Sequence, residues 1–152
     1  MAAMLPPSTP RLTALTPYLL STVGKVARTL VGDLLAARDL RLWDMAVLAV
    51  LADHGPLPQR DLAERLALHP SDVVKVLDGL ARRGYVDRAR DTADRRRVLA
   101  GISEPGLRVL DELVAEVATV HDDLLAPLDA AERATLHALL LRVHAHAVGG
   151  RP

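Results

Sequence analysis

The sequence predicts a mainly α-helical fold with one small β-hairpin. Half of the 152 residues are hydrophobic, but only 2% are aromatic and none is Phe. The core must therefore be built from Leu, Val and Ala, which favour helix-on-helix packing. Apolar residues recur at three- and four-residue steps along most of the chain, whereas one short segment alternates as a strand does. The length is that of one ordinary domain, or of a compact core with helical appendages.

The N-terminal region predicts an arm and two helices. Residues 1–10 are expected to form a flexible arm, because they contain three prolines and lack the basic and apolar segments of a secretory signal. Residues 11–38 follow as a long amphipathic helix, whose regular part is expected to begin near Thr16 because Pro17 suits a first helical turn. Residues 42–53 form a second, nearly all-apolar helix. Trp43 in this helix is expected to be a core anchor.

Two short helical patterns with a tight break between them come next. They cover residues 59–66 and 71–83, which is the spacing of a helix-turn-helix. The second helix is expected to be capped by Ser71, so that its polar first turn, with Asp72 and Lys75, faces outward. Such an exposed turn is where a recognition helix contacts bases. The side chains expected to face inward are Leu62, Ala63, Leu66, Val73, Val76, Leu77 and Leu80.

A β-hairpin, or wing, is predicted after these helices. Gly84 suits a left-handed helix stop, residues 85–90 alternate like a strand, and residues 97–102 form the returning strand. Residues 82–97 hold seven arginines against three aspartates, so this stretch carries +4 in a chain whose net charge is zero. A basic hairpin therefore projects from an acidic body.

Residues 105–126 and 129–148 predict two further amphipathic helices, the second opened by an Asp129-Ala-Ala-Glu132 capping box. Their apolar stripes, like that of residues 11–38, are too long for one small module to cover. We therefore expect residues 11–38 and 105–148 to pack together and to intertwine with a second copy as dimerisation helices. Residues 42–104 are expected to form a winged helix-turn-helix domain between them.

This arrangement predicts binding to double-stranded DNA. A helix can enter the major groove while cations hold phosphates or the minor groove, and the N-terminus of the first short helix adds backbone N–H donors for phosphate. The wing arginines suit phosphates or a narrow minor groove, and Asp94 is expected to orient one of them. The candidate DNA-binding residues are Gln59, Arg60, Ser71, Asp72, Lys75, Asp94, Arg95, Arg96 and Arg97.

Residues 42–106 resemble the MarR family of bacterial regulators in the order and spacing of their motifs. The family's D-x-R wing motif is matched by Asp94-Arg95-Arg96, and its helix-opening segment by Ile102-Ser103-Glu104-Pro105-Gly106. The two short helices, the strand entry at residues 84–88 and the flanking helices also agree with the family pattern. Two positions depart from it: Asp72 places an acid in the reading turn, and Gly79 stands where a larger polar residue is common.

The resemblance implies a homodimeric transcription regulator, with the role of a repressor, that binds a pseudo-palindromic operator. It implies that Arg96 enters the minor groove and that Asp94 positions the wing arginines. It also implies a small aromatic or anionic effector, bound between the dimerisation helices and the winged domain, that releases the DNA.

Other classes of function find less support in the sequence. An enzyme is not expected, since there is neither a G-x-S-x-G turn nor a Gly-rich phosphate loop. The absence of Cys excludes disulfides, thiolate metal sites and thiol-based redox sensing, and no cofactor is expected. No apolar run reaches the roughly 18 residues of a membrane span, so a cytoplasmic protein without membrane partners is expected.

Two alternatives stay open. One is a winged-helix protein-interaction module that does not bind DNA, whose binding would not fall steeply with salt. The other is a metal-responsive regulator that uses the C-terminal histidines. Against it, His144 and His146 point to different helix faces, and His137 with His144 needs a third ligand.

Overall fold

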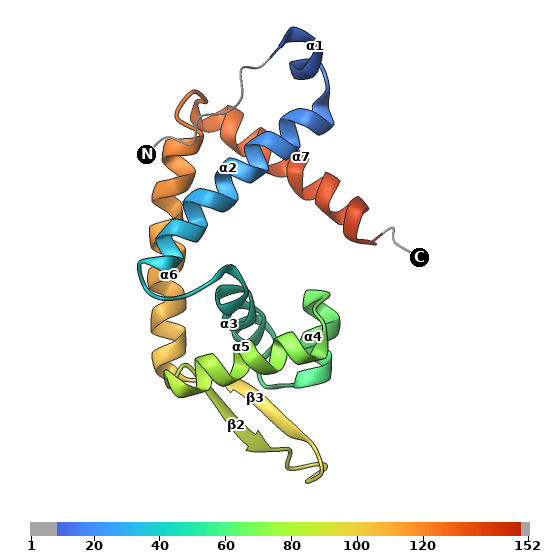
Figure 1. The fold of residues 1–152 in the computed structure, drawn as a ribbon, viewed down its shortest axis with the longest axis vertical. Helices are drawn as coiled ribbons and strands as arrows, with labels where there is room; N and C mark the ends of the chain where they lie inside the picture. Colours follow the sequence, from blue (N-terminus) through green and yellow to red (C-terminus); the bar gives the residue numbers. More distant parts are fainter. Residues whose placement is uncertain (1–8, 150–152) are drawn as a thin grey trace. The chain divides into compact units, whose positions relative to one another are not determined.

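The computed structural model describes residues 9–149, which are mainly helical with one small antiparallel sheet, as the sequence predicts (Figure 1). Residues up to Val117 form one compact unit and residues from Ala118 another. The elements, in order, are α1 (Pro10–Thr13), α2 (Thr16–Ala36), α3 (Leu42–His54), β1 (Leu57–Pro58), α4 (Gln59–Leu66), α5 (Pro70–Arg82), β2 (Val86–Arg90), β3 (Val98–Ile102), α6 (Glu104–Leu124) and α7 (Ala130–Gly149). None of the helices within residues 9–149 is long and apolar enough to cross a membrane.

The predicted N-terminal helix is interrupted near its start. Leu15 is extended, with φ −99° and ψ 110°, and the long helix α2 begins at Thr16, where the sequence predicts it. Pro17 in the first turn lacks an N–H group, which favours a helix start at this point. Pro10 already belongs to the short helix α1, so the expected arm is too long by one residue at its end. The first eight residues of that arm lie outside the described residues.

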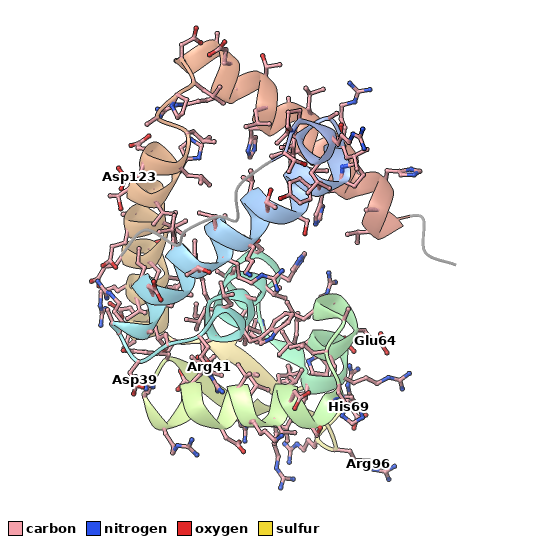
Figure 2. All side chains as sticks on the ribbon, turned by 45° about the horizontal axis from the view of Figure 1, so that its top comes forward. Asp39, Arg41, Glu64, His69, Arg96 and Asp123 are labelled. Atoms are coloured by element: carbon pink, nitrogen blue, oxygen red, sulfur yellow. The ribbon has the colours of Figure 1, made fainter. Side chains whose placement is uncertain are left out.

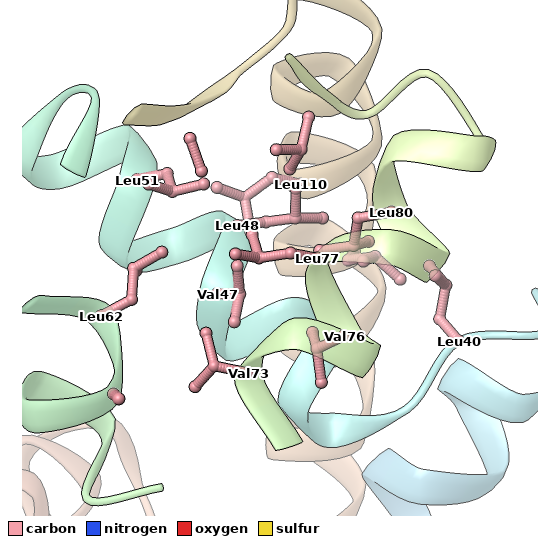
Figure 3. Close-up of a cluster of buried hydrophobic side chains, with 14 of the residues drawn as sticks. Leu40, Val47, Leu48, Leu51, Leu62, Val73, Val76, Leu77, Leu80 and Leu110 are labelled. Carbon is pink, nitrogen blue, oxygen red and sulfur yellow. The ribbon is translucent and has the colours of Figure 1, made fainter. Parts of the chain in front are cut away.

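The core of the first unit is formed mainly by α3, α4 and α5, with contributions from β3 and α6 (Figure 3). The predicted inward face of α5 is confirmed, because the four residues expected on it are at most 5% exposed. Leu62 and Ala63 of α4 are buried as well, whereas Leu66 is only partly buried. The buried residues of α3 and α5 are Asp44, Val47, Leu48, Leu51, Val73, Val76, Leu77 and Leu80.

The prediction that Trp43 is a core anchor is wrong for the single chain, in which it is 48% exposed. The first turn of α3 is oriented by a capping interaction, in which the Arg41 N–H donates to the Asp44 carboxylate at 2.7 Å. This interaction turns Asp44 inward, to 6% exposure. Because successive helical residues are about 100° apart around the axis, Trp43 faces outward.

The sheet has the strand order β1-β3-β2, and both pairs are antiparallel. The hairpin β2–β3 is in the predicted place and pairs Val86 with Ile102 and Arg90 with Val98. Gly84 has the predicted left-handed conformation, with φ +74°, and the next N–H, of Tyr85, donates to the Leu80 carbonyl at 3.0 Å. The helix therefore ends sharply, and Figure 1 shows the hairpin extending away from α5.

The second unit contains the end of α6 and the whole of α7. The predicted capping box is confirmed: the Asp129 N–H donates to Glu132 and the Glu132 N–H donates to Asp129, both at 2.9 Å. Arg133 closes the turn by donating to the Leu125 and Leu128 carbonyls and to Asp122. No residue of α7 is buried in the single chain. Its exposed large apolar residues are Leu139, Leu140, Leu141, Val143 and Val148.

Candidate nucleic-acid interface

Helix α5 has one buried face and one polar, exposed face. The exposed face carries Asp72 and Lys75 in its N-terminal half, and their side chains are 56% and 74% exposed. Lys75 Nζ lies 3.3 Å from Asp72 Oδ1, so the two charges form a single exposed unit. Asp72 lies in the first turn and Lys75 in the second, so the exposed polar start that the sequence predicts for a recognition helix is present.

The N-cap of α5 is His69, and the prediction that Ser71 caps the helix is wrong. His69 Nδ1 accepts the Ser71 N–H at 3.2 Å and lies 2.7 Å from the Ser71 hydroxyl oxygen. The helix starts one residue earlier than predicted because Pro70 suits the first helical position, where no N–H donor is needed. The Ser71 hydroxyl is thus engaged within the protein, although its residue is exposed.

Helix α4 places Gln59 and Arg60 in its first turn, as predicted. No side chain caps this helix N-terminus, whose N-cap residue is Pro58. Arg60 is 86% exposed and pairs with Glu64, one turn along the helix, with Nε and Oε1 3.0 Å apart. Arg97 lines the same shallow hollow as Arg60, so the returning wing strand begins beside α4.

The tip of the wing is folded by its aspartates. Asp91 accepts the Ala93 N–H at 2.9 Å, and Asp94 accepts the Arg96 N–H at 3.0 Å. Two backbone bonds complete the turn, from the Asp91 N–H to the Arg97 carbonyl and from the Arg97 N–H to the Asp94 carbonyl. Asp94 therefore acts on the backbone of Arg96, and no ion pair of Asp94 with a wing guanidinium is found within residues 9–149.

The three arginines of the wing tip, Arg95, Arg96 and Arg97, are all exposed. In the part of the chain that the structure describes, their side chains make neither a hydrogen bond nor an ion pair. Figure 2 shows the Arg96 side chain at the periphery of the wing. Three cations are therefore held on an ordered turn and left available to a polyanion.

An ion pair joins β2 of the wing to α5. Arg88 Nη2 lies 2.6 Å from Asp78 Oδ1, and both side chains are about 40% exposed, at 38% and 43%. No local sequence pattern indicates this pair. The residues are ten positions apart on different elements, and only the fold brings them together.

Ser103 joins the base of the wing to α6. Its N–H donates to the Tyr85 carbonyl at 3.0 Å, and its hydroxyl donates to the Gly84 carbonyl at 2.5 Å. The same hydroxyl accepts the Gly106 N–H at 3.1 Å. The end of α5, the strand entry and the start of α6 are therefore held together by one buried side chain. A serine directly before Glu104-Pro105 is a helix-start signal that the sequence offered.

The loop between α2 and α3 forms ion pairs with two different helices. Arg38 donates to Glu112 at 2.7 Å and also to Glu116, both on α6. These hydrogen bonds to two carboxylates favour the charged guanidinium and raise the pKa of Arg38 above its already high ordinary value. Asp39 adopts φ +58° and accepts from Arg83, at the end of α5, through both its carbonyl and its carboxylate. Two adjacent residues thus connect α6 and α5.

A metal centre finds no support in residues 9–149, where no three His, Asp or Glu side chains are placed to share an ion.

Comparison with known proteins agrees with this geometry. The sequence profile of the MarR family matches residues 38–97. The PcaV transcriptional regulator of Streptomyces coelicolor, solved with its natural ligand, is 31% identical, has a TM-score of 0.70, and is matched over 92% of this chain and 99% of its own. A mutant MarR from E. coli is 25% identical with a TM-score of 0.76, over 85% of this chain and 96% of its own.

Among curated relatives, the transcriptional repressor NicR of Pseudomonas putida is 28% identical over 96 residues, which are 63% of this chain and 61% of NicR. The match to a regulatory protein of Thauera aromatica likewise spans only 59% of that protein. These relatives are transcription regulators and not enzymes. With its winged helix-turn-helix fold and its match to the family profile, the chain belongs to the MarR family of transcription regulators.

Proposed function

We propose that this chain is a repressor that binds a pseudo-palindromic operator as a homodimer. The observation that carries the proposal is the pairing of an exposed polar turn on α5 with three unpartnered arginines on an ordered wing. In a two-fold symmetric dimer, two α5 helices about one DNA turn apart, roughly 34 Å, enter successive major grooves. The wings then grip the flanking DNA.

The proposed contacts divide into those that recognise bases and those that bind phosphates or the minor groove. Asp72 and Lys75 face base edges from the first two turns of α5. The backbone N–H groups at the start of α4, with Gln59 and Arg60 beside them, bind phosphate. Arg95, Arg96 and Arg97 bind phosphates or enter the minor groove, whose negative potential deepens where it is narrow. Ser71 lies at the same end of α5, with its hydroxyl held by His69.

The homodimer is supported by the apolar surface of the single chain. Large apolar side chains are 39–66% exposed on α1, α2, α6 and α7, including Leu19, Leu30, Val114, Leu139 and Val143. A monomer would leave this surface in water, whereas soluble monomers rarely expose large apolar patches. A second copy that presents the same surface buries it by symmetry.

Release by a small effector is supported by a hollow between α2 and α3 in which Trp43 and Arg28 lie together. Ala27, Val31, Leu42 and Ala46 complete its lining. An exposed indole and a guanidinium suit an aromatic, anionic molecule. PcaV was solved with its natural ligand and CouR of Rhodococcus jostii with p-coumaroyl-CoA. An effector that prefers a dimer with misaligned recognition helices releases DNA, and about 2–3 kcal/mol of coupling gives a tens-fold effect.

The test is binding of the purified protein to the DNA upstream of its own gene across a salt series. Wild type is expected to bind specifically, with an affinity that falls steeply as salt rises, because bound phosphates release counterions. Arg96→Ala is expected to bind more weakly and to lower the slope of log K against log salt by about 1. Arg108→Ala removes one positive charge on α6 and is the matched control, expected to match wild type. If wild type shows no specific binding even at low salt, the proposal is wrong. The alternative function, a protein-interaction module that does not bind DNA, is then favoured.

A further inference from the structure

Few side chains on the exposed face of α5 are free to read bases. Asp78 is held by Arg88 at 2.6 Å, and the Ser71 hydroxyl lies 2.7 Å from His69 Nδ1. Arg82 lies at the far end of the helix, about three turns from the N-terminal turn that enters a groove. Asp72 and Lys75 therefore remain as the exposed charged side chains of the N-terminal half of α5.

The carboxylate of Asp72 restricts which groups of DNA can lie against this part of α5. Phosphates repel the Asp72 carboxylate, which accepts hydrogen bonds and donates none. In the major groove its only complementary partners are the amino groups of bases, which are cytosine N4 and adenine N6. Burying the carboxylate against a base edge without such a donor costs free energy, so Asp72 selects against unsuitable sequences.

Lys75 supplies the opposite chemistry beside it. Its Nζ is a donor only, and the guanine edge offers two adjacent acceptors, O6 and N7. Since Nζ and Asp72 Oδ1 are 3.3 Å apart, a donor and an acceptor leave the helix side by side. The two side chains are thus arranged together before any DNA is bound.

We infer that Asp72 and Lys75 are the specificity-determining residues and that together they read a G·C pair in each half of the operator. The major-groove edge of a G·C pair presents two acceptors on guanine followed by one amino donor on cytosine. Lys75 donates to guanine O6 and N7, and Asp72 accepts from cytosine N4. This inference rests on the proposed function, in which α5 enters the major groove.

An A·T pair fits the same two side chains less well. Its amino donor lies between two separate acceptors, N7 and O4, and the thymine methyl group occupies the far edge. Lys75 would lose the adjacent pair of acceptors, and the methyl group would face a charged unit instead of an apolar one. The structure therefore favours G·C over A·T at this step of the operator.

The experiment is selection of bound duplexes from a randomised DNA pool, using the full chain, followed by sequencing. Wild type is expected to enrich sites with a G·C pair at symmetric positions of both halves, preferred by roughly ten-fold over the alternatives. Asp72→Asn is expected to lose the preference for cytosine and to move toward adenine, since Asn pairs with adenine N6 and N7. Lys75→Gln is expected to lose the preference for guanine at the same step.

Asp87→Asn is the matched control, because it removes the same charge from exposed β2. Both Asn variants are expected to bind unrelated DNA more tightly, as a repelling charge is gone, but only Asp72→Asn changes the selected bases. If wild type enriches sites and Asp72→Asn enriches the same ones with equal preference, the inference is overturned while the proposed function stands. If wild type enriches no sequence, the proposed function itself fails.

Discussion

Gly106 is the residue at which the backbone leaves least room. A Cβ at this position would overlap the Tyr85 carbonyl oxygen and lie 2.9 Å from Ile102 Cγ1. Because one neighbour is backbone and the other is a packed side chain, neither can move easily to avoid a clash with an added Cβ. The wing base can therefore approach α6 closely only because no side chain intervenes.

Gly106→Ala is expected to lower the free energy of unfolding by about 1–3 kcal/mol, the usual cost of forcing atoms into a packed site. Gly79→Ala is the control within the same domain. Its Cβ would meet only the end of the Arg82 side chain, at 4.0 Å, so the gain in helix propensity should stabilise α5 by about 0.5–1 kcal/mol. Urea denaturation followed by circular dichroism measures both changes. Equal stabilities of Gly106→Ala and wild type would contradict the close approach.

His69 offers a second test at a single residue. His69→Ala removes the acceptor of the Ser71 N–H and is expected to destabilise the protein by about 1 kcal/mol, whereas His69→Asn keeps a good N-cap and should stay near wild type. Thermal unfolding measures both variants. His121→Ala, which alters an exposed histidine on α6, should change nothing. A loss of stability in the Asn variant as large as that in the Ala variant would show that capping is not the role of His69.

Residue-scale predictions from the sequence succeeded where periodicity decides and failed where an offset of one or two residues matters. The inward face of α5 follows from the three- and four-residue spacing of its apolar residues, and it is confirmed. The Ser71 cap and the burial of Trp43 both depend on the exact rotation of a first helical turn. Pro70 and the Arg41–Asp44 interaction set those rotations. The spacing of apolar residues carries no information about either of them.

At the scale of elements, the Asp78–Arg88 pair tests whether the wing must be held at a fixed angle to α5. Because both side chains are partly exposed, the pair should contribute only about 0–1 kcal/mol to stability. Asp78→Ala is nevertheless expected to weaken operator binding several-fold, although it removes a negative charge that would otherwise repel DNA. Fluorescence anisotropy with labelled operator measures the change in binding, and thermal unfolding measures the change in stability. Tighter binding by Asp78→Ala would mean that only its charge matters.

The sequence predicted the elements that carry the site but not the contacts that join them. The two short helices and the hairpin have strong local signals, namely apolar spacing, Gly84 and strand alternation. Strand β1 was missed because it has two residues and one is a proline, which edge strands tolerate. The ion pairs of Arg38 and Asp39 span 44 to 78 positions, so no local pattern indicates them.

At the scale of the whole molecule, the exposed apolar surface predicts that folding and association are linked. The melting temperature is expected to rise with protein concentration, as it does when a partner binds only the folded state. Leu139→Asp, which places a charge among the exposed apolar residues of α7, should shift the sedimentation coefficient toward that of a monomer. Arg142→Asp on the same helix, which changes the net charge by two negative units, is the control for charge alone. A wild-type protein that sediments as a monomer at micromolar concentration would rule out the dimer.

The residues that shape the wing tip differ from those that we propose to bind DNA. Asp91 and Asp94 fold the turn through backbone N–H groups, and the guanidinium groups of Arg95, Arg96 and Arg97 take no part in it. Substitution of these arginine side chains would therefore leave the hydrogen bonds that fold the turn in place. Under the proposed function, substitutions at these three positions would change the strength of DNA binding while the turn keeps its shape, whereas exchanging either aspartate would remove a hydrogen bond that folds the turn.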